Sequence, residues 1–263
     1  MKGPLLLVDI GNTSTTTAVM RGEEIIELNR FLRKDGVDNN LGRAVEQYRP
    51  FAPSRVIVGS VVPDLTPKWR DELADRLGCG SWELVPGAPL EIPVSYPNPA
   101  SIGADRLANA VAAVKLVGAP VVVADFGTAL TFDIVTRDQG YIGGVIAPGI
   151  DMMYSYFGEK TALLPKLTPN PCAKVVGTST EEAMHAGAYY GYRGMVREIF
   201  HEIRKNLNLP DISLVATGGF ASQVLRGFDE SVRILPHLTL RGLAFAWQFS
   251  ISSSTDLYET DPN

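Results

Sequence analysis

Two aspartates, Asp9 and Asp125, hold the same position in two similar stretches of this 263-residue chain. Each follows four apolar residues and precedes one apolar residue, a glycine and a polar run, after which apolar residues return. The two stretches are LLLVDIGNTSTTTAV at 5–19 and VVVADFGTALTFDIV at 121–135. The repeat predicts an internal duplication in which each copy supplies one carboxylate and one glycine turn.

The glycine turns suit phosphate binding. Gly11 and Gly127 let backbone N–H groups approach phosphate oxygens closely, and Asn12 and Thr128 follow them as side-chain donors. Two carboxylates near a polyphosphate require cations between them, so Mg²⁺ with ATP is the expected ligand. A single Asp-x-Gly after a strand is more often ordinary turn chemistry, and the second occurrence favours function. The chain lacks G-x-x-x-x-G-K-[ST], and no G-x-G-x-x-G follows a predicted strand.

Asp105 is the candidate for acid–base chemistry. It lies in the segment Ile-Gly-Ala-Asp-Arg, in the first turn of a predicted helix after the proline-rich loop 86–101. Its carboxylate could accept a hydroxyl proton while Arg106 and exposed N–H groups hold an anionic substrate. The alternative is structural, because the helix dipole favours an acidic residue there by about 0.3–1 kcal/mol.

Apolar periodicity and breaker residues predict the elements that position these side chains. Strands are expected at 5–10, 16–20, 23–32, 54–63 and 82–85, and again at 121–127, 128–136, 140–149 and 213–219. Helices are expected at 41–49, 66–78, from Ser101 as its cap to Gly118, at 178–206 and at 239–250.

Two halves that each open with a hairpin carrying Asp and Gly are typical of the actin-like phosphotransferase superfamily. The expected fold class is α/β, with two ribonuclease-H-like (actin-like ATPase) domains related by internal duplication and a nucleotide cleft between them. The expected domains are 1–116 and 117–250, with the last helix able to pack back on the first domain. A polar tail at 251–263 should be disordered.

The composition argues against several classes of protein. A formal net charge of −5 provides no global positive field for nucleic acid or anionic lipid. Cys79 and Cys172 lie far apart and the three histidines are scattered, which argues against a disulfide framework or a zinc site and suits a reducing cytosol. No run of 18 apolar residues occurs, so a soluble cytoplasmic protein without a membrane partner is expected.

The order of motifs resembles type III pantothenate kinase, of the actin-like (acetate and sugar kinase) superfamily, over about residues 5 to 249. The motifs that carry the resemblance are Asp9-Ile-Gly-Asn-Thr13, Ser60-Val-Val-Pro63, Gly103-Ala-Asp-Arg106, Asp125-Phe-Gly-Thr128, Gly143-Gly-Val-Ile-Ala-Pro-Gly149 and Thr217-Gly-Gly219. The resemblance implies ATP-dependent phosphorylation of pantothenate, the first committed step of coenzyme A synthesis. It further implies a homodimer that uses Mg²⁺ and a monovalent cation, K⁺ or NH₄⁺.

The resemblance also implies roles for individual residues. Asp105 would be the general base and Asp125 the monovalent-cation ligand. ATP would be bound by Asp9, Ile10, Gly11, Asn12, Thr13, Ser14, Thr15, Thr16 and Thr128. Pantothenate would be bound by Tyr96, Gly103, Ala104, Asp105, Arg106 and Thr180.

Three positions depart from the family pattern, and two other functions stay open. The family usually has Lys where this chain has Gly177-Thr-Ser-Thr180, an acidic residue at Arg241, and often Lys near Thr16. One alternative is a regulatory ATP-binding module without kinase activity. The other is a phosphotransferase or polyphosphate hydrolase with a different acceptor, because a fold does not select its substrate.

A stripe of small residues marks the long predicted helix. Ala183, Gly187, Gly191 and Gly194 recur at three- and four-residue intervals, so another backbone could approach one face closely. That backbone belongs either to the same domain or to a second copy of the chain.

Overall fold

The computed structural model describes residues 3–161, 163–170, 172 and 174–256, which form two compact units. The first unit takes the described residues up to Leu116, together with Gln139–Tyr141 and those from His237 onward. The second unit takes Val117–Asp138 and the described residues within Ile142–Pro236. The last helix is grouped with the first unit rather than with the residues that precede it, because it packs on the first sheet.

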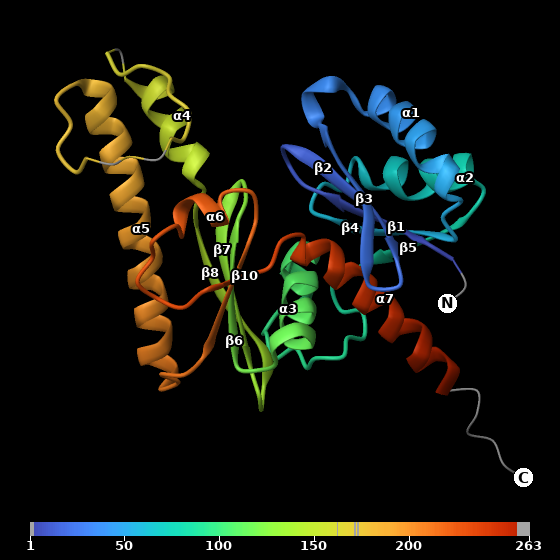
Figure 1. Ribbon diagram of the computed structural model, residues 1–263. Helices are drawn as coiled ribbons and strands as arrows, with labels where there is room; N and C mark the ends of the chain where they lie inside the picture. The colour runs from blue at the N-terminus through green and yellow to red at the C-terminus, as the bar shows by residue number, and fades with distance from the viewer. Residues whose placement is uncertain (1–2, 162, 171, 173, 257–263) are drawn as a thin grey trace, which may run out of the picture. The chain divides into compact units, whose positions relative to one another are not determined.

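The first unit contains a five-stranded sheet in the order β3-β2-β1-β4-β5 (Figure 1). Its strands are β1 (Leu5–Ile10), β2 (Ser14–Arg21), β3 (Glu24–Leu32), β4 (Arg55–Ser60) and β5 (Gly80–Leu84). The first three strands pair antiparallel, whereas β4 runs parallel to β1 and β5 parallel to β4.

Helices cover this sheet. They are α1 (Val37–Tyr48), α2 (Leu73–Leu77), α3 (Ala104–Val117) and α7 (Leu238–Asp256), with short helical turns at Arg33–Asp35, Arg49–Phe51, Lys68–Glu72 and Pro99–Ser101. Side chains alternate along a strand, so Leu6, Val8 and Ile10 all point into the core formed with α1 and α2. α7 contacts β1, β4 and β5, and its buried Leu243 occupies the space that a side chain at Gly59 would need.

The second sheet repeats the order of the first. Its order is β10-β9-β6-β7-β8, and its strands are β6 (Val121–Phe126), β7 (Ala129–Thr136), β8 (Gly140–Pro148), β9 (Ser213–Thr217) and β10 (Arg233–Ile234). Again an antiparallel hairpin, β6 with β7, is followed by a parallel neighbour, β9. The predicted duplication is therefore confirmed strand by strand.

α4 (Ile150–Lys160), α5 (Thr180–Leu207) and α6 (Ala221–Val224) supply the helices of the second unit. Phe132 and Phe200 meet edge to face in the core between the sheet and α5. At the start of α5, the Ser179 side chain accepts a hydrogen bond from the backbone N–H of Glu182, whose carboxylate accepts from Thr178. The departure from the family pattern at Thr178 thus forms a helix cap.

The structure corrects several expectations. The helix predicted at 66–78 forms without interruption over 66–77, but it contains an unpredicted π-helical segment, Lys68–Glu72, before α2. Ser101 does not cap α3, because its hydroxyl donates to the Asn98 carbonyl and the helix begins only at Ala104. α4 was not predicted.

The polar tail predicted at 251–263 is also corrected, because α7 continues to Asp256. Three serines at 252–254 have low helix propensity, but in this helix Ser252 and Ser253 both donate to the carbonyl of Phe249. The rest of the predicted tail lies outside the described residues.

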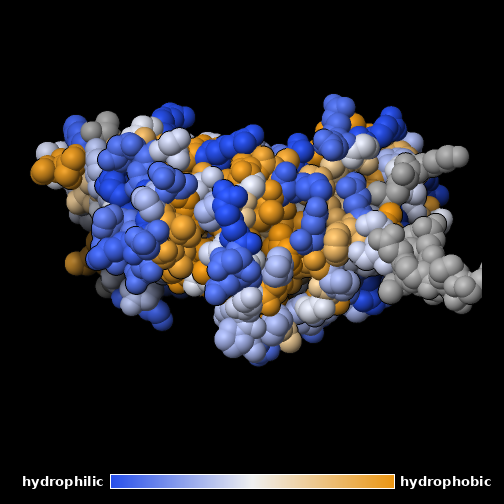
Figure 2. Space-filling model, turned by 90° about the horizontal axis from the view of Figure 1, so that it is seen from below, coloured by the Kyte–Doolittle hydropathy of each residue, from blue (hydrophilic) through white to orange (hydrophobic). Residues whose placement is uncertain are grey.

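Hydrophilic and apolar residues alternate over the face drawn in Figure 2. No helix in the described part of the chain is both long and apolar enough to span a bilayer.

Candidate functional site

The first turn joins β1 to β2. Ile10 pairs with Thr15, and the loop Gly11–Ser14 between them is closed by a 3.0 Å hydrogen bond from the Gly11 N–H to the Ser14 carbonyl. Asn12 and Thr13 are exposed at the tip. Ile10 is fully buried and Thr15 is 4% exposed, so Ile10 can offer a ligand only backbone groups.

Asp9 lies on the opposite face of the sheet from Ile10 because successive side chains alternate. Its neighbours in register are Thr16 on β2 and Gly59 on β4. The half-buried carboxylate therefore stands at the end of β1, one residue before the turn that is expected to bind phosphate.

Two arginines that the sequence analysis missed flank the first turn. Nε of Arg30 donates to the Ser14 hydroxyl at 2.8 Å. The backbone N–H of Arg33 donates to the Thr13 carbonyl at 3.0 Å, and its Nη1 lies 3.5 Å from the Asn12 carbonyl. Their only sequence signal was one cation on the third strand of the meander and a second directly after it.

A pocket of about 190 Å³ lies beside the first turn on the side of α1. It is lined by Gly11, Thr15, Arg33, Val37, Asn40, Leu65 and Trp69.

The second turn is one residue shorter than the first. Phe126 pairs with Leu130, so the loop spans only Gly127–Ala129, and the Gly127 N–H donates to the Ala129 carbonyl at 3.1 Å. Thr128 is exposed at its tip, and Asp125 is half-buried one residue before the loop. Gly127 therefore begins its loop as Gly11 does, but the two loops differ in length after the glycine.

Two glycines from distant motifs close around the second turn. A Cβ on Gly149 would lie 2.1 Å from the Thr128 carbonyl oxygen, and a Cβ on Gly218 would lie 2.6 Å from Oδ1 of Asp125. Gly218 also has a φ of 91°, which disfavours any side chain. The motifs that contain Asp125, Gly149 and Gly218 therefore meet at the second turn.

Asp105 is the second residue of α3 and is half-buried. Its Oδ1 accepts a hydrogen bond from the Arg106 N–H at 2.8 Å. Burial raises the pKa of the carboxyl above its ordinary value, and this hydrogen bond and the Arg106 charge oppose the rise only in part. The carboxyl is thus a stronger base than an exposed aspartate.

Aromatic rings support the residues beside Asp105. The Arg106 guanidinium lies 6.0 Å from the ring centre of buried Tyr141, and Tyr96 meets the same ring edge to face at 6.1 Å. Tyr96, Gly103, Asp105 and Arg106 are thereby brought together in the first unit. Of the other residues predicted to bind pantothenate, Ala104 is 2% exposed and has only its backbone to offer, and Thr180 is exposed in the first turn of α5.

Val61 connects Asp105 to the first turn. Its N–H donates to the Ile10 carbonyl at 3.1 Å, and its Cγ1 lies 3.3 Å from where a Cβ of Gly103 would be. Val61 belongs to the Ser60-Val-Val-Pro63 motif, so this motif brings the predicted base beside the predicted phosphate turn.

The donors at the two turns suit hard cations. Among the residues that the structure describes, no group of three or more His, Cys, Asp and Glu side chains forms a protein-only metal site. Mg²⁺ commonly uses one or two carboxylates together with substrate phosphates and water, and single carboxylates at Asp9 and Asp125 fit that pattern. Close backbone packing at Gly218 leaves the Asp125 carboxylate room that a side chain would fill.

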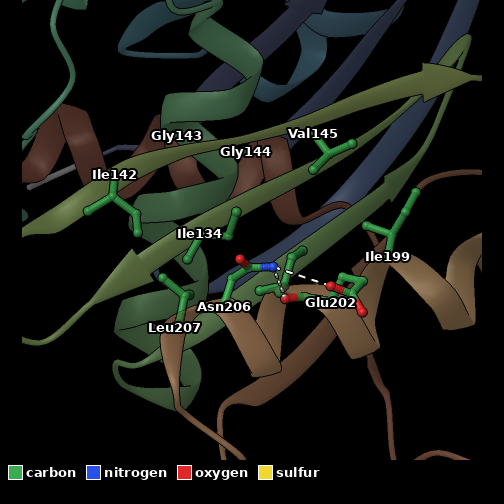
Figure 3. A pocket seen from close by; sticks show the side chains of 10 residues that line it. Ile134, Ile142, Gly143, Gly144, Val145, Ile199, Glu202, Asn206 and Leu207 are labelled. Carbon is green, nitrogen blue, oxygen red and sulfur yellow. Dashed lines mark hydrogen bonds between the residues drawn. The ribbon is translucent and has the colours of Figure 1, made fainter.

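A separate pocket of about 320 Å³ lies between β7, β8 and α5 (Figure 3). Its wall is mostly aliphatic, and its one carboxylate, Glu202, accepts from Lys205 and from the amide of Asn206. None of the predicted site residues lines it, so it is not the candidate for catalysis.

The small-residue stripe lies on the outer face of α5. Ala183, Gly187 and Gly191 are exposed, and an added Cβ on either glycine would meet no atom within 4 Å. Gly194 is half-buried and Gly177 packs on the backbone of Ala183, so the middle of the stripe, at Gly187 and Gly191, is the part left uncovered by the described chain.

Solved structures of other proteins share the fold of this chain. A solved structure of a Campylobacter jejuni protein of the Baf family has a TM-score of 0.59 and 19% identity, and covers 95% of this chain and 99% of that chain. A ROK family glucokinase from Streptomyces griseus, in complex with glucose and AMPPNP, has a TM-score of 0.51 and 15% identity over 94% of this chain and 100% of its own. At these identities the likeness concerns the fold, which is the two-domain actin-like ATPase and sugar kinase fold.

Sequence relatives narrow the class to one family. The family profile of type III pantothenate kinase matches residues 5–202. A type III pantothenate kinase from Methylacidiphilum infernorum is 40% identical over 241 residues, which cover 91% of this chain and 86% of the relative. The chain belongs to the type III pantothenate kinase family.

Proposed function

We propose that this protein transfers the γ-phosphoryl group of ATP to the terminal hydroxyl of pantothenate, the first committed step of coenzyme A synthesis. Membership of the family supports the reaction. The observation that carries the residue assignment is the contact of Val61 with both the first turn and Gly103, because it holds Asp105 beside the turn.

Asp105 is the proposed general base. Oδ1 is engaged by the Arg106 N–H, which leaves Oδ2 to receive the hydroxyl proton of the acceptor. A buried carboxyl with a raised pKa takes up a proton more readily than an exposed one, and positioned bases contribute about 10²- to 10⁴-fold in rate. Phosphoryl transfer has a loose transition state, so orientation of the hydroxyl is as much its task as proton removal.

The acceptor is proposed to lie against Arg106 and Tyr96. The guanidinium can pair with the pantothenate carboxylate through two parallel hydrogen bonds. The face of the Tyr141 ring limits the conformations of that guanidinium, so less side-chain entropy is lost when the substrate binds. Thr180 is proposed to add a hydroxyl contact.

The nucleotide phosphates are proposed to bind the residues from Asp9 to Thr16 and, separately, Thr128. Asp9 would hold Mg²⁺ and Asp125 a monovalent cation. When bound, these cations neutralise charge on the phosphate oxygens. The exposed N–H groups and side chains of Asn12 and Thr13 are the proposed phosphate donors at the first turn.

A product assay tests the proposal. Purified protein is incubated with ATP, Mg²⁺, K⁺ and pantothenate, beside a panel of other small hydroxylated acceptors, and the products are identified by mass spectrometry. Formation of 4'-phosphopantothenate alone supports the proposal. Phosphorylation of a different acceptor would favour a phosphotransferase with another substrate. Nucleotide binding without any product would favour a regulatory ATP-binding module.

We further propose a homodimer in a cytoplasmic setting. The exposed positions Gly187 and Gly191 on α5 support the dimer, because no other segment of the described chain lies within 4 Å of a Cβ added at either. The two free cysteines, Cys79 and Cys172, suit the reducing compartment.

A further inference from the structure

Arg30 lies in one row with Asp9 across three strands. Thr16 is the register partner of Asp9 on β2, and Arg30 is the register partner of Thr16 on β3. Directly opposed residues in a sheet point to the same face, so the Arg30 side chain leaves the sheet on the face of the Asp9 carboxylate. Two strand spacings of about 4.8 Å separate the two backbones.

The Arg30 side chain is directed to the first turn. Its Nε donates to the Ser14 hydroxyl at 2.8 Å, which brings the guanidinium to the end of the hairpin, where the loop Gly11–Ser14 joins β2. A guanidinium has five N–H donors, so this bond leaves four for another acceptor. The residue is exposed, and a ligand can reach it without a change in the core.

No carboxylate in the described part of the chain forms an ion pair with Arg30. The nearest acidic residues in sequence have other partners: Glu27 accepts from Gln47 at 2.7 Å, and Asp35 lies 3.9 Å from Arg43. The chain carries a net charge of −5, yet here a fixed cation stands beside a predicted phosphate turn. Arginine on a turn of this kind suits a multiply charged phosphate, which it can bind through two hydrogen bonds.

We propose that Arg30 binds the terminal phosphate group of the nucleotide, with Ser14 as the residue that orients it. The inference rests on the proposed ATP-dependent function and adds a residue to it. In this role Arg30 neutralises the charge of the γ-phosphate group, so it discriminates between ATP and nucleotides that lack this group, ADP and AMP.

Titration calorimetry with the full-length protein tests the role of Arg30. The ligands are MgATP, MgADP and AMP, and the variants are Arg30→Gln and Arg30→Lys. Loss of a charge-assisted hydrogen bond should weaken MgATP binding by about 10- to 100-fold in Arg30→Gln, with AMP binding unchanged. The MgATP affinity of Arg30→Lys should lie between those of the wild type and Arg30→Gln, because lysine keeps the charge and loses the paired donors.

Arg21→Gln is the matched control. Arg21 ends β2 at the opposite end from the turn and is exposed, so the variant removes the same charge from the same hairpin. Its affinities should equal those of the wild type. Equal weakening of all three nucleotides in Arg30→Gln, with a lower Tm, would mean that Arg30 only braces the turn and would overturn the proposal. Unchanged MgATP affinity would overturn it as well, while intact kinase activity in that variant would leave the proposed function standing.

Discussion

Gly103 and Asp105 are so close that a Cβ on Gly103 would lie 2.4 Å from Oδ1 of the aspartate. Real Cβ atoms essentially never approach this closely, so the glycine is required by the position of the carboxylate. Val61 lies 3.3 Å from the same point and closes the other side.

Gly103→Ala should displace the Asp105 carboxylate. The carboxylate is the flexible end of its side chain, so it moves before the backbone does, and the Tm should change little. A misplacement of this kind costs up to about 10²-fold in kcat. Gly42→Ala on α1, where an added Cβ meets nothing within 4 Å, is the matched control and should keep full activity. Full activity in Gly103→Ala would contradict the role of Asp105.

Asp105→Asn should lower kcat by about 10²- to 10⁴-fold, or roughly 3–5 kcal/mol of barrier, because Asn keeps the shape and cannot accept the proton. Stability should not fall. The folded pKa is raised above the unfolded one, so at neutral pH the ionised carboxylate disfavours the fold, and its removal relieves that cost. A lowered Tm with unchanged turnover would instead support a purely helix-capping role.

The pH profile should reflect the burial of Asp105. Activity requires the ionised carboxylate, so kcat/KM falls as pH decreases through its pKa. Since burial raises that pKa, the acid limb should lie above the ordinary aspartate value of 3.8. The measurement is kcat/KM against pH, with the residual activity of Asp105→Asn as control. An acid limb that persists unchanged in this variant would assign it to another group.

Activity should depend on a monovalent cation at Asp125. Rates in K⁺ and NH₄⁺ should greatly exceed those in a bulky organic cation, and Asp125→Asn should abolish the difference. Steady-state rates at constant ionic strength provide the measurement. Equal wild-type rates in all three salts would contradict the role of Asp125 as the ligand of a monovalent cation.

Gly187→Leu should separate the proposed dimer. The outer face of α5 has space for leucine in a single chain, so the variant should fold normally and fail only at an interface. The molar mass measured by light scattering and the kinase activity should then decrease together. The control is Gly42→Ala again, and a fully active monomeric variant would show that the stripe has no part in assembly.

The repeated turns could be predicted from the sequence because each depends on local features. Strand alternation, a glycine and a polar run are visible within fifteen residues, and both hairpins form as expected. The long helix α5 was also predicted to within two residues at its start, where Ser179 and Glu182 provide the cap.

The position of Arg30 could not be predicted, because it depends on a bulge. The register between β2 and β3 shifts between Val19 and Met20. Counted back from the hairpin end, where Arg21 pairs with Glu24, a regular ladder would place Asn29 opposite Thr16. The bulge shifts the strand by one residue, which reverses every side chain after it and brings Arg30 to the Asp9 face. No local pattern marks this bulge, and the contact of Val61 with Gly103 likewise joins residues 42 positions apart in the sequence.

The attachment of α7 to the first sheet has a consequence for folding during synthesis, because the two partners lie far apart in the sequence. Leu243 fills the space over Gly59, and Gly242 approaches the Ala108 carbonyl so closely that a Cβ would lie 1.9 Å away. We therefore expect the first unit to lack part of the wall of its core until α7 has been synthesised, whereas the second unit contains no residue beyond Pro236. Although its strands are made first, we expect the amino-terminal sheet to complete its packing after the second unit, with the apolar residues under α7 exposed until then.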